Sequence, residues 1–572
     1  MAEKKDKKSA VSKAVKNRKP MPEKREAECP IQILGTNDGA YFFMSKLGEM
    51  RKFRTYELNE AGFQSLFDGD LTWLQKYFPI KPNSGRAKTG CEFNVSAARS
   101  YLIKRCVEKR LFDASMPIRK TGVWKHASGQ PVIHCGDEVL INGTWTQAGF
   151  EDEGCMYVAA PAIAKPADEP APLEKCKELL AGFKLWNFEH KHGAEIALGL
   201  LGQAFIAGTL DWKAHALFYG LLGSGKSTLL ELMEAALGSA CFIPSTGNTE
   251  AGLRQDMNNQ ARVGLLDEAE NDAYSTGNTK RMIKMIRQMS GGRGANIQRG
   301  TPGGTAQHFR LNSCIMMFCI SPPPLEPQDL SRITRLRLLP LTSKQKSGGK
   351  TRVKAAIALA AELAPKLWRR AIDQRDHFEQ AFHVFHSYLT DHMNLSARAA
   401  DQFGTILAGM DIFLCDYPPE ESDSIEERVE MIRPLIEEWI ANEDTENEGQ
   451  LCLNRLYSSP VALGRDDNKT IGKAILDAMD ASKGEWARET LVQIGLMLRD
   501  FHTKTPHLLV ANQHEGLRRA AFQNSKWQSG WLDALRSLPG IGAAGNCISF
   551  DGVSSRATRI PFEYLPSKQD KA

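Results

Sequence analysis

The chain has 572 residues, of which 42% are hydrophobic and 25% are charged, a composition typical of globular proteins with a sizeable core. At this length about three to four domains are expected. The net charge of +5 permits a nucleic-acid partner without requiring one, and the sequence shows neither a secretory signal nor an apolar run of about 20 residues that could span a bilayer. We therefore expect a cytoplasmic protein that has no membrane partner.

The N-terminal part of the chain changes composition twice. Residues 1–28 are rich in lysine and poor in aromatic residues, which predicts a disordered basic tail. From residue 29, short apolar runs alternate with turn signals around one helical stretch, "SAARSYLIKRCVEKRLF". An α+β domain of unknown role is expected over residues 29–160. The Pro/Ala-rich stretch "AAPAIAKPADEPAP" then predicts a linker, which we place at residues 161–175.

Three further segments complete the predicted organisation. Alternating strands and helices over residues 176–345 predict a parallel α/β sheet. Residues 350–445 are mostly helical, and residues 450–572 combine helices with short terminal strands. The predicted fold class is therefore multidomain, with an α+β N-terminal domain, a central P-loop α/β domain and a mostly helical C-terminal region that ends in a winged-helix-like domain.

The stretch "GLLGSGKS", residues 220–227, matches the phosphate-loop pattern G-x-x-x-x-G-K-[ST] between an apolar strand and a helix-forming segment. Glycines allow successive backbone N–H groups to surround phosphate oxygens at a helix N-terminus. Lys226 is expected to reach the β and γ phosphates, and the Ser227 hydroxyl to bind Mg²⁺. The predicted ligands are therefore ATP and Mg²⁺. The residues expected to hold the nucleotide are Gly220, Gly223, Ser224, Gly225, Lys226, Ser227 and Thr228.

An acidic pair follows the next strongly apolar strand, in "RVGLLDEAE". A phosphate loop requires such a carboxylate for the metal, so Asp267 is predicted to share Mg²⁺ with Ser227. The adjacent Glu268 is predicted to polarise the attacking water. This pair favours hydrolysis over phosphoryl transfer to a small molecule.

Two later motifs complete the predicted catalytic set. The apolar strand "CIMMFCIS" ends at Ser321, a candidate γ-phosphate contact. In "DLSRITRLRLLPL" three arginines lie at the start of a further strand, and an arginine from a neighbouring subunit can stabilise the transition state of NTP hydrolysis. Arg332 is the first candidate because it precedes the strand, and Arg335 is the second. The alternative is that these arginines form only a solvated strand edge.

Between the acidic pair and Ser321 lies the glycine-rich stretch "GGRGANIQRGTPGGTAQHF". It has no GK[ST] and does not open a helix, so a second phosphate loop is not expected. The segments "ANIQRG" and "TAQHFRL" flank "TPGG", a turn signal, and are predicted to pair as a β-hairpin.

This order of motifs resembles the superfamily III (AAA+-type) replicative helicases of phages, satellite elements and DNA viruses. The resemblance is carried by residues 213–341, where "EAGLRQDMNNQARVGLLDEAEND" is similar to helicase-like ATPases of prophages and mobile elements. It implies an AAA+ ATPase domain, a hexameric ring with ATP between subunits, and movement on single-stranded DNA through a central pore. In that family an asparagine often stands where this chain has Ser321. Primase signatures are absent from the N-terminal region.

The resemblance predicts an ATP-dependent DNA helicase or translocase for replication of a phage or mobile element in a bacterial or phage-infected cell. Expected partners are single-stranded or forked DNA, further copies of the chain, and a replication initiator or primase. The alternatives are an AAA+ regulator or remodelling ATPase that does not unwind DNA, and a binding module whose nucleotide controls only assembly. A purely structural hairpin is the alternative to a DNA-contacting one. The predicted DNA contacts are Arg293, Gln298, Arg299 and His308.

Protein metal sites and disulfides are not predicted. The twelve cysteines are scattered without a CxxC pair, which indicates reduced thiols. His190 and His192 are separated by one residue, a spacing that does not place both on one helical face. The candidates of the N-terminal domain lack paired ligand spacing. They are Lys125, His126, His134 and Cys135.

Overall fold

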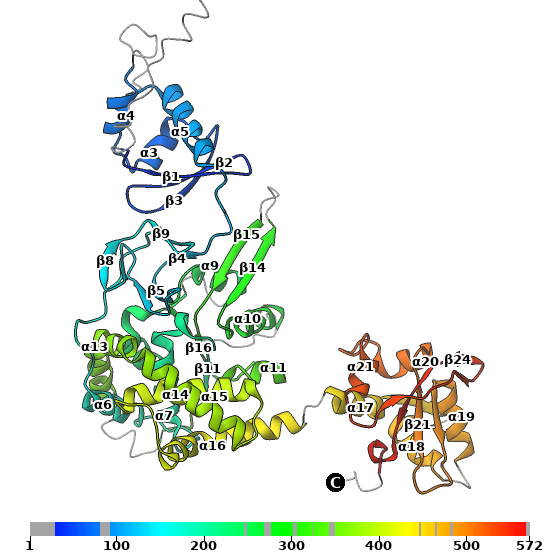
Figure 1. The fold of residues 1–572 in the computed structure, drawn as a ribbon. Coiled ribbons are helices and arrows are strands. Elements are labelled where there is room, and N and C mark those ends of the chain that lie inside the picture. The colour runs from blue at the N-terminus through cyan, green and yellow to red at the C-terminus, as the bar shows by residue number, and fades with distance from the viewer. Residues whose placement is uncertain are drawn as a thin grey trace, which may run out of the picture. The chain divides into compact units, whose positions relative to one another are not determined.

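A computed structural model shows two compact units, Met1–Pro434 and Leu435–Ala572, coloured from blue to yellow and from yellow to red in Figure 1. No helix in the described part of the chain is long and apolar enough to cross a membrane. The predicted basic tail lies outside the described residues. The structure describes residues 29–80, 92–244, 249–267, 276–300, 306–323, 325–341, 349–445, 448–463, 466–480 and 484–567.

Within residues 29–80 and 92–109, the structure describes an antiparallel three-stranded sheet and three helices. The strands are β1 (Gln32–Asn37), β2 (Ala40–Met44) and β3 (Met50–Arg54), and the helices are α3 (Glu60–Leu66), α4 (Thr72–Tyr77) and α5 (Val95–Lys109). Buried aromatic side chains, among them Phe43, Phe63 and Trp73, fill the core between sheet and helices. This mixture of helices and antiparallel strands is of the α+β kind.

Short strands follow in two small sheets, with the orders β4-β10-β9 and β5-β6-β7-β8. They are β4 (Ile118–Arg119), β5 (Gly122–Lys125), β6 (Pro131–His134), β7 (Glu138–Ile141), β8 (Thr144–Gln147), β9 (Phe150–Asp152) and β10 (Cys155–Tyr157). We call residues 118–158 the small-sheet region. The backbone N–H of Lys120 donates to Asn259 O at 2.7 Å, and that of Ala261 donates to Thr121 O at 2.9 Å. These bonds tie the small-sheet region to the loop before the acidic strand.

The Pro/Ala-rich stretch is tied to a later helix. The N–H of Ala167 donates to Pro365 O at 3.0 Å, and that of Ala171 donates to Lys366 O at 2.9 Å. Because Pro365 lies inside helix α13 (Gly349–Asp373), the stretch runs along this helix. Helix α6 (Leu173–Phe183) begins inside the range expected for the linker.

The centre of the first unit is a five-stranded sheet with the order β12-β13-β16-β11-β17, and every pair in it is parallel. The strands are β11 (His215–Tyr219), β12 (Cys241–Phe242), β13 (Val263–Leu266), β16 (Ile315–Cys319) and β17 (Ile333–Arg337). The parallel α/β prediction is therefore confirmed for this sheet. Because β11, β13 and β16 run in the same direction, the loops that follow them meet at one edge of the sheet, which we call the carboxyl edge.

Helices cover the sheet and are followed by an all-helical segment. The helices next to the sheet are α7 (Gly193–Phe205), α8 (Lys226–Leu237), α9 (Glu250–Asp256), α10 (Thr276–Met289) and α11 (Pro327–Leu330). After α13 come α14 (Arg375–Asp391), α15 (Ala397–Leu414) and α16 (Ser422–Thr445). A Cβ on Gly202 of α7 would lie 2.1 Å from Gly409 O of α15, so these two helices approach backbone to backbone. The all-helical segment therefore packs against α7 through small residues.

The second unit has its own sheet and core. It contains α17 (Glu448–Ser458), β18 (Pro460–Leu463), β19 (Asp466–Thr470), α18 (Ile471–Ala478), α19 (Glu485–Gln493), β20 (Leu496–Arg499), β21 (His507–Ala511), α21 (Trp531–Arg536), β22 (Gly542–Ala543), β23 (Ile548–Phe550), β24 (Val553–Ser555) and β25 (Ala557–Ile560). The strands β20, β21, β25 and β22 form an antiparallel sheet. Two successive helices followed by a β-hairpin, here α18, α19 and β20–β21, are the elements that a winged-helix-like domain needs.

Candidate functional site

The predicted phosphate loop connects β11 to α8 at the carboxyl edge of the sheet. Gly223 and Gly225 have φ values of +81° and +86°, conformations that L side chains rarely adopt. A Cβ on Gly225 would also lie 2.9 Å from Nε1 of Trp186. Helix α8 begins at Lys226, directly after this glycine. The strand, the loop and the helix N-terminus are arranged as anion binding requires, because the first backbone N–H groups of a helix have no partner inside it.

Side chains of the loop and of the first turn of α8 are held by backbone carbonyls of the loop. Lys226 Nζ donates to Gly220 O at 2.6 Å, and Thr228 Oγ1 donates to Gly225 O at 2.9 Å. The Lys226 side chain therefore lies against the backbone of the phosphate loop. Ser227 is exposed, whereas Ser224 is fully buried and its hydroxyl has no hydrogen-bond partner among the described residues.

The structure places the predicted metal ligand and the predicted γ-phosphate contact near this loop. Asp267 directly follows β13 and is exposed, and Ser321 follows β16 and is exposed. Strand β16 lies between β13 and β11, and the N–H of Gly220 donates to Cys319 O at 3.4 Å. Asp267 and Ser321 therefore lie on the same edge as the phosphate loop. Glu268 lies outside the described residues.

The two predicted arginine fingers lie away from this edge within the same chain. Arg332 precedes β17, its carbonyl accepts from His215 N at 3.1 Å, and its guanidinium donates to Gln328 O at 2.6 Å. Burial lowers the pKa of Arg332. Arg335 lies in the middle of β17, beside Leu217. Neither arginine therefore lies beside the phosphate loop of its own chain.

Arg337 lies at the opposite end of the same strand. It is level with Tyr219, the last residue before the phosphate loop, and forms an ion pair with Glu189 at 2.9 Å. Both side chains are partly exposed. The sequence placed Arg337 among the three arginines of this motif without choosing it as a finger. Only the pairing of β17 with β11 brings it to the carboxyl edge.

Trp186 is a site residue that the sequence analysis missed. Its indole N–H donates to Gly225 O at 2.8 Å, and its side chain is buried. The residues after Trp186 pair with the end of β17, since the N–H of Glu189 donates to Arg337 O at 2.9 Å and that of Leu339 donates to Asn187 O at 2.8 Å. This pairing holds the indole against the phosphate loop. From the sequence one can expect that a buried tryptophan donates its indole N–H to some acceptor. The sequence does not indicate that this acceptor is Gly225 O.

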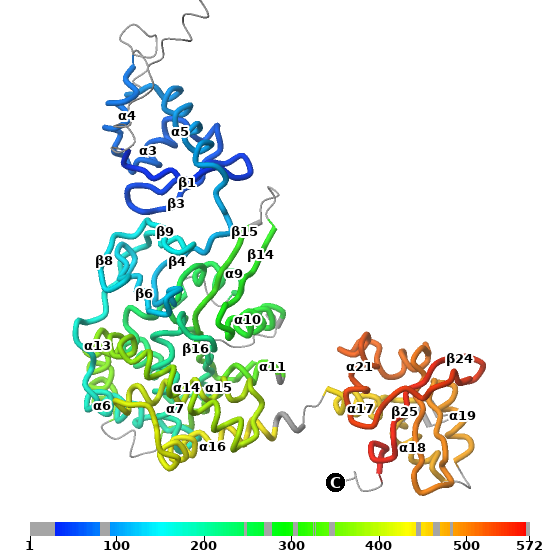
Figure 2. Tube along the Cα trace, in the orientation of Figure 1, coloured from blue at the N-terminus to red at the C-terminus, as the bar shows by residue number. Residues whose placement is uncertain are grey.

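The predicted hairpin is present as β14 (Ala295–Gly300) paired with β15 (Ala306–Leu311), next to α9 and α10 in Figure 1 and Figure 2. The hairpin prediction is confirmed, and residues 301–305 of its turn lie outside the described residues. Gln298 lies opposite His308, and Arg299 lies opposite Gln307. Because side chains alternate between the faces of a strand, Arg299 is on the other face from Gln298 and His308. Arg293 is exposed in the turn before β14.

One face of the hairpin packs on α9. The guanidinium of Arg254 lies 4.2 Å from the centre of the Phe309 ring and pairs with Glu250 at 3.1 Å. Arg299 lies on this face, and its Nη2 is 3.6 Å from Oε2 of Glu250. The predicted DNA contacts are therefore divided between an open face and a face that has an ion pair with α9.

The base of the hairpin is tied to the residues that lead into β11. Lys213 is fully buried, and its ammonium donates to Leu210 O at 3.2 Å and to Gly291 O at 2.9 Å. Burial lowers the pKa of Lys213 to about 8. Trp212 and Gly291 also form a β-bridge. The same short segment therefore precedes the phosphate-loop strand and fixes the start of the hairpin.

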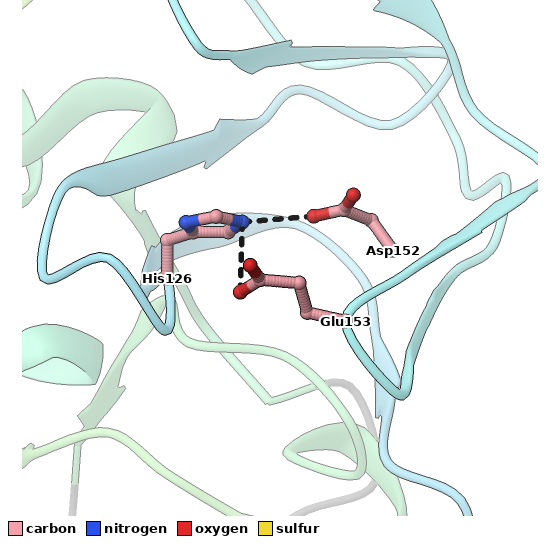
Figure 3. A group of neighbouring side chains, drawn as sticks. All are labelled: His126, Asp152 and Glu153. Carbon is pink, nitrogen blue, oxygen red and sulfur yellow. Dashed lines mark hydrogen bonds and ion pairs between the residues drawn. The ribbon is translucent and has the colours of Figure 1, made fainter.

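The structure brings together a group of possible metal ligands that the sequence did not predict, His126, Asp152 and Glu153 (Figure 3). The other N-terminal candidates are engaged elsewhere: His134 Nε2 bonds to Val158 O at 2.9 Å, and its Nδ1 accepts from Gly136 N at 3.0 Å. Burial lowers the pKa of His134 to about 4 and raises that of Cys135 to about 12. Only His126 of the four earlier candidates belongs to the new group.

The solved structures described below are distant likenesses of the chain. No family model and no curated protein matches the chain. Among solved structures, SCCmec type IV Cch, described as an active helicase, is 13% identical over 94% of both chains, with a TM-score of 0.47. The apo C-terminal region of NrS-1 is 10% identical over 93% of this chain and 97% of its own, with a TM-score of 0.33. A proposed ATPase of Cytophaga hutchinsonii is 13% identical over 45% of this chain and 84% of its own, with a TM-score of 0.28. Likenesses at this level do not assign a function.

Proposed function

We propose that the chain is an ATP-dependent DNA helicase or translocase that acts in the replication of a phage or mobile element. The observation that carries the proposal is a complete phosphate loop at the carboxyl edge of a parallel sheet, in a core that also fixes an exposed β-hairpin. The loop supplies an ATPase site, and the hairpin supplies a separate surface for a polymer. A motor requires that ATP hydrolysis at the nucleotide site changes the position of the surface that binds the polymer.

The residues present fit Mg²⁺-ATP. The loop glycines leave space for phosphate oxygens, and Ser227 and Asp267 are exposed oxygen ligands of the kind that Mg²⁺ prefers. Mg²⁺ would neutralise charge that develops on the transferred phosphoryl group. Lys226 would leave the carbonyl of Gly220 and bind the β and γ phosphates. Glu268 would orient the water that attacks the γ-phosphorus while the bond to the bridging oxygen breaks.

We propose that Arg332 or Arg335 acts on the nucleotide of a neighbouring copy of the chain. Arg332 and Arg335 lie away from the carboxyl edge of their own sheet, so either could complete only the site of a neighbour. A guanidinium supplied in this way stabilises the charge of the transition state. We therefore propose a ring, with six copies as in the family that the sequence resembles. Ser321 is proposed as the contact that detects the γ-phosphate.

The hairpin is proposed to hold single-stranded or forked DNA. A translocating protein must hold successive phosphates without reading the bases, which requires cationic and hydrogen-bonding side chains on an exposed element. Gln298 and His308 are exposed on the open face, and Arg293 is exposed at the base. Arg299 is half-exposed beside Glu250. Through Gly291, Lys213 joins this element to the strand that ends in the phosphate loop.

A strand-displacement assay tests the proposal directly. The wild-type protein should separate a forked duplex with ATP and Mg²⁺ and should fail on a blunt duplex that offers no single strand for loading. Lys226→Ala removes the ammonium expected on the phosphates, so we expect ATP hydrolysis and displacement to fall to background. The matched control is Lys184→Ala, because Lys184 is an exposed lysine that pairs with Glu195 at 2.8 Å outside the loop.

The outcome of this assay separates the alternatives. ATP hydrolysis that DNA does not stimulate, with no displacement of either duplex, would favour a remodelling ATPase over a helicase. Hydrolysis that persists in Lys226→Ala would remove the nucleotide-site assignment itself. Loss of activity in Lys184→Ala would instead point to a general loss of fold.

A further inference from the structure

Two tight turns of the small-sheet region bring three ligand side chains together. His126 follows β5, and Asp152 ends β9. Glu153 and Gly154 form the two-residue turn between β9 and β10, with φ values of +44° and +72°. Two-residue hairpin loops commonly use such positive φ values. The two carboxylates therefore project from one turn toward the histidine of the other, as Figure 3 shows.

The ligand atoms of these residues are close enough to share one ion. His126 Nε2 lies 2.8 Å from Asp152 Oδ2 and 3.3 Å from Glu153 Oε2, and all three ligand atoms lie within 4.8 Å of one another. Ligands that are each about 2.0–2.2 Å from a metal ion stand at similar separations. Only the imidazole is buried, and the Asp152 and Glu153 side chains are 33% and 50% exposed. An ion could therefore enter from solvent.

A residue outside the trio holds the imidazole in this orientation. His126 Nδ1 lies 2.6 Å from Ser128 Oγ, so Nε2 faces the carboxylates. In metal sites the second nitrogen of a ligating histidine is usually hydrogen-bonded in this way, which fixes the tautomer and the direction of the ring. The backbone N–H of Ser128 also lies 3.2 Å from Nδ1. A cation bound at Nε2 requires the imidazole proton on Nδ1, where it would donate to Ser128 Oγ.

The simpler interpretation is an ion pair between the histidine and the carboxylates. However, Nε2 carries at most one proton, which the two carboxylates at 2.8 Å and 3.3 Å would have to share. A divalent cation, in contrast, would be bound by all three groups. One imidazole with two carboxylates is a mixed nitrogen and oxygen set that suits Mn²⁺, Fe²⁺ or Zn²⁺, whereas Ca²⁺ and Mg²⁺ prefer all-oxygen sites.

We propose that His126, Asp152 and Glu153 bind one divalent transition-metal ion, which joins the turn after β5 to the turn between β9 and β10. The site is distinct from the nucleotide's Mg²⁺ and does not depend on the function proposed above. The ion stabilises the small-sheet region, which is hydrogen-bonded to the loop before β13 through Lys120 and Thr121.

Titration of Mn²⁺ into the chelator-treated full chain, without nucleotide, tests the proposal. Free Mn²⁺ is followed by its electron paramagnetic resonance signal, and Mn²⁺ binds only weakly to the thiols that would complicate a Zn²⁺ titration. We expect one bound Mn²⁺ per chain and a higher melting temperature. The double variant Asp152→Asn/Glu153→Gln should lose both effects. Ser128→Ala should keep the site and bind Mn²⁺ about tenfold more weakly.

Two controls separate this site from others. Glu151→Gln makes the same change on β9, but Glu151 is exposed and alternates to the other face of the strand, so it should bind like wild type. Lys226→Ala should also bind like wild type, because the phosphate loop is not involved. Circular dichroism checks that each variant is folded.

Two results would overturn the proposal. One is a wild-type chain that binds no Mn²⁺ at millimolar concentration. The other is a folded double variant that still binds one equivalent. In the first case the trio is only a histidine–carboxylate ion pair, and in the second the ion lies elsewhere.

Discussion

The hydrogen bond from Trp186 to Gly225 O shows how a residue outside every motif can set the shape of the phosphate loop. The indole packs against Gly225 at the point where α8 begins, and the segment after it is fixed by β17. The carbonyl that it binds belongs to the glycine directly before Lys226. Trp186 therefore fixes the backbone directly before Lys226, and we infer that it positions this lysine.

Trp186→Phe should weaken ATP binding while leaving the protein folded. Phenylalanine keeps most of the apolar contact but cannot donate to Gly225 O, and a buried hydrogen bond contributes about 1 kcal/mol, which is about a fivefold change in affinity. Fluorescence titration with a labelled ATP analogue measures this change. Trp486→Phe is the control, because Trp486 is exposed in the second unit. Equal affinities of wild type and Trp186→Phe would contradict the positioning role.

At the scale of single residues, the sequence predicted those parts of the site that are local. The pattern of Gly220 to Ser227 places its groups through neighbouring backbone, so their arrangement follows from the motif itself. Trp186 and Arg337 depend on which strands pair, and His126 meets Asp152 only because two turns converge. A rule based on spacing along the chain cannot detect ligands that come together through the fold.

At the scale of elements, the sequence predicted the two strands of the β14–β15 hairpin but not the helix that covers one of its faces. The Pro-Gly turn signal and the flanking segments identified both strands, and Ile297 and Phe309 face each other as a cross-strand pair. The sequence did not show which face is covered, because Glu250 and Arg254 of the covering helix are distant in the chain. The order of the strands in the parallel sheet is equally a long-range property.

Arg299→Ala tests whether the arginine on the covered face reaches DNA. If Arg299 exchanges Glu250 for a phosphate, the variant should keep basal ATP hydrolysis and lose its stimulation by single-stranded DNA. The slope of log affinity against log salt should also fall by about 0.7, the value of one phosphate contact on a single strand. Binding isotherms at several salt concentrations measure this slope.

A second variant of the same hairpin serves as the comparison for Arg299→Ala. Gln298→Ala removes an uncharged side chain from the open face, so DNA affinity should fall at a constant salt slope. If Arg299→Ala leaves both the slope and the stimulation unchanged, the ion pair with Glu250 is a purely structural anchor.

At the scale of the whole molecule, the alternation of elements predicted several regions but not how closely they are joined. The expected helical domain packs on α7 through Gly202 and Gly409, and the Pro/Ala-rich stretch runs along α13 by way of Ala167 and Ala171. Contacts made by small residues and backbone hydrogen bonds cannot be predicted from the spacing of hydrophobic residues along the chain. The first unit therefore extends to Pro434, across the predicted boundary near residue 350.

Residues 448–572 should fold without the rest of the chain. Their core is formed within the segment, by side chains such as Leu456, Ile475, Leu498, Val510 and Ile560, and four of their strands form one sheet. A segment that buries its own apolar surface has the main source of stability that a domain needs. We expect the isolated segment to be monomeric and to unfold cooperatively in urea, as followed by circular dichroism. The complementary fragment, residues 1–445, should keep basal ATP hydrolysis, because the phosphate loop, Asp267 and the carboxyl edge all lie within it. A segment 448–572 that binds hydrophobic dyes and melts without a transition would show instead that its core requires the first unit.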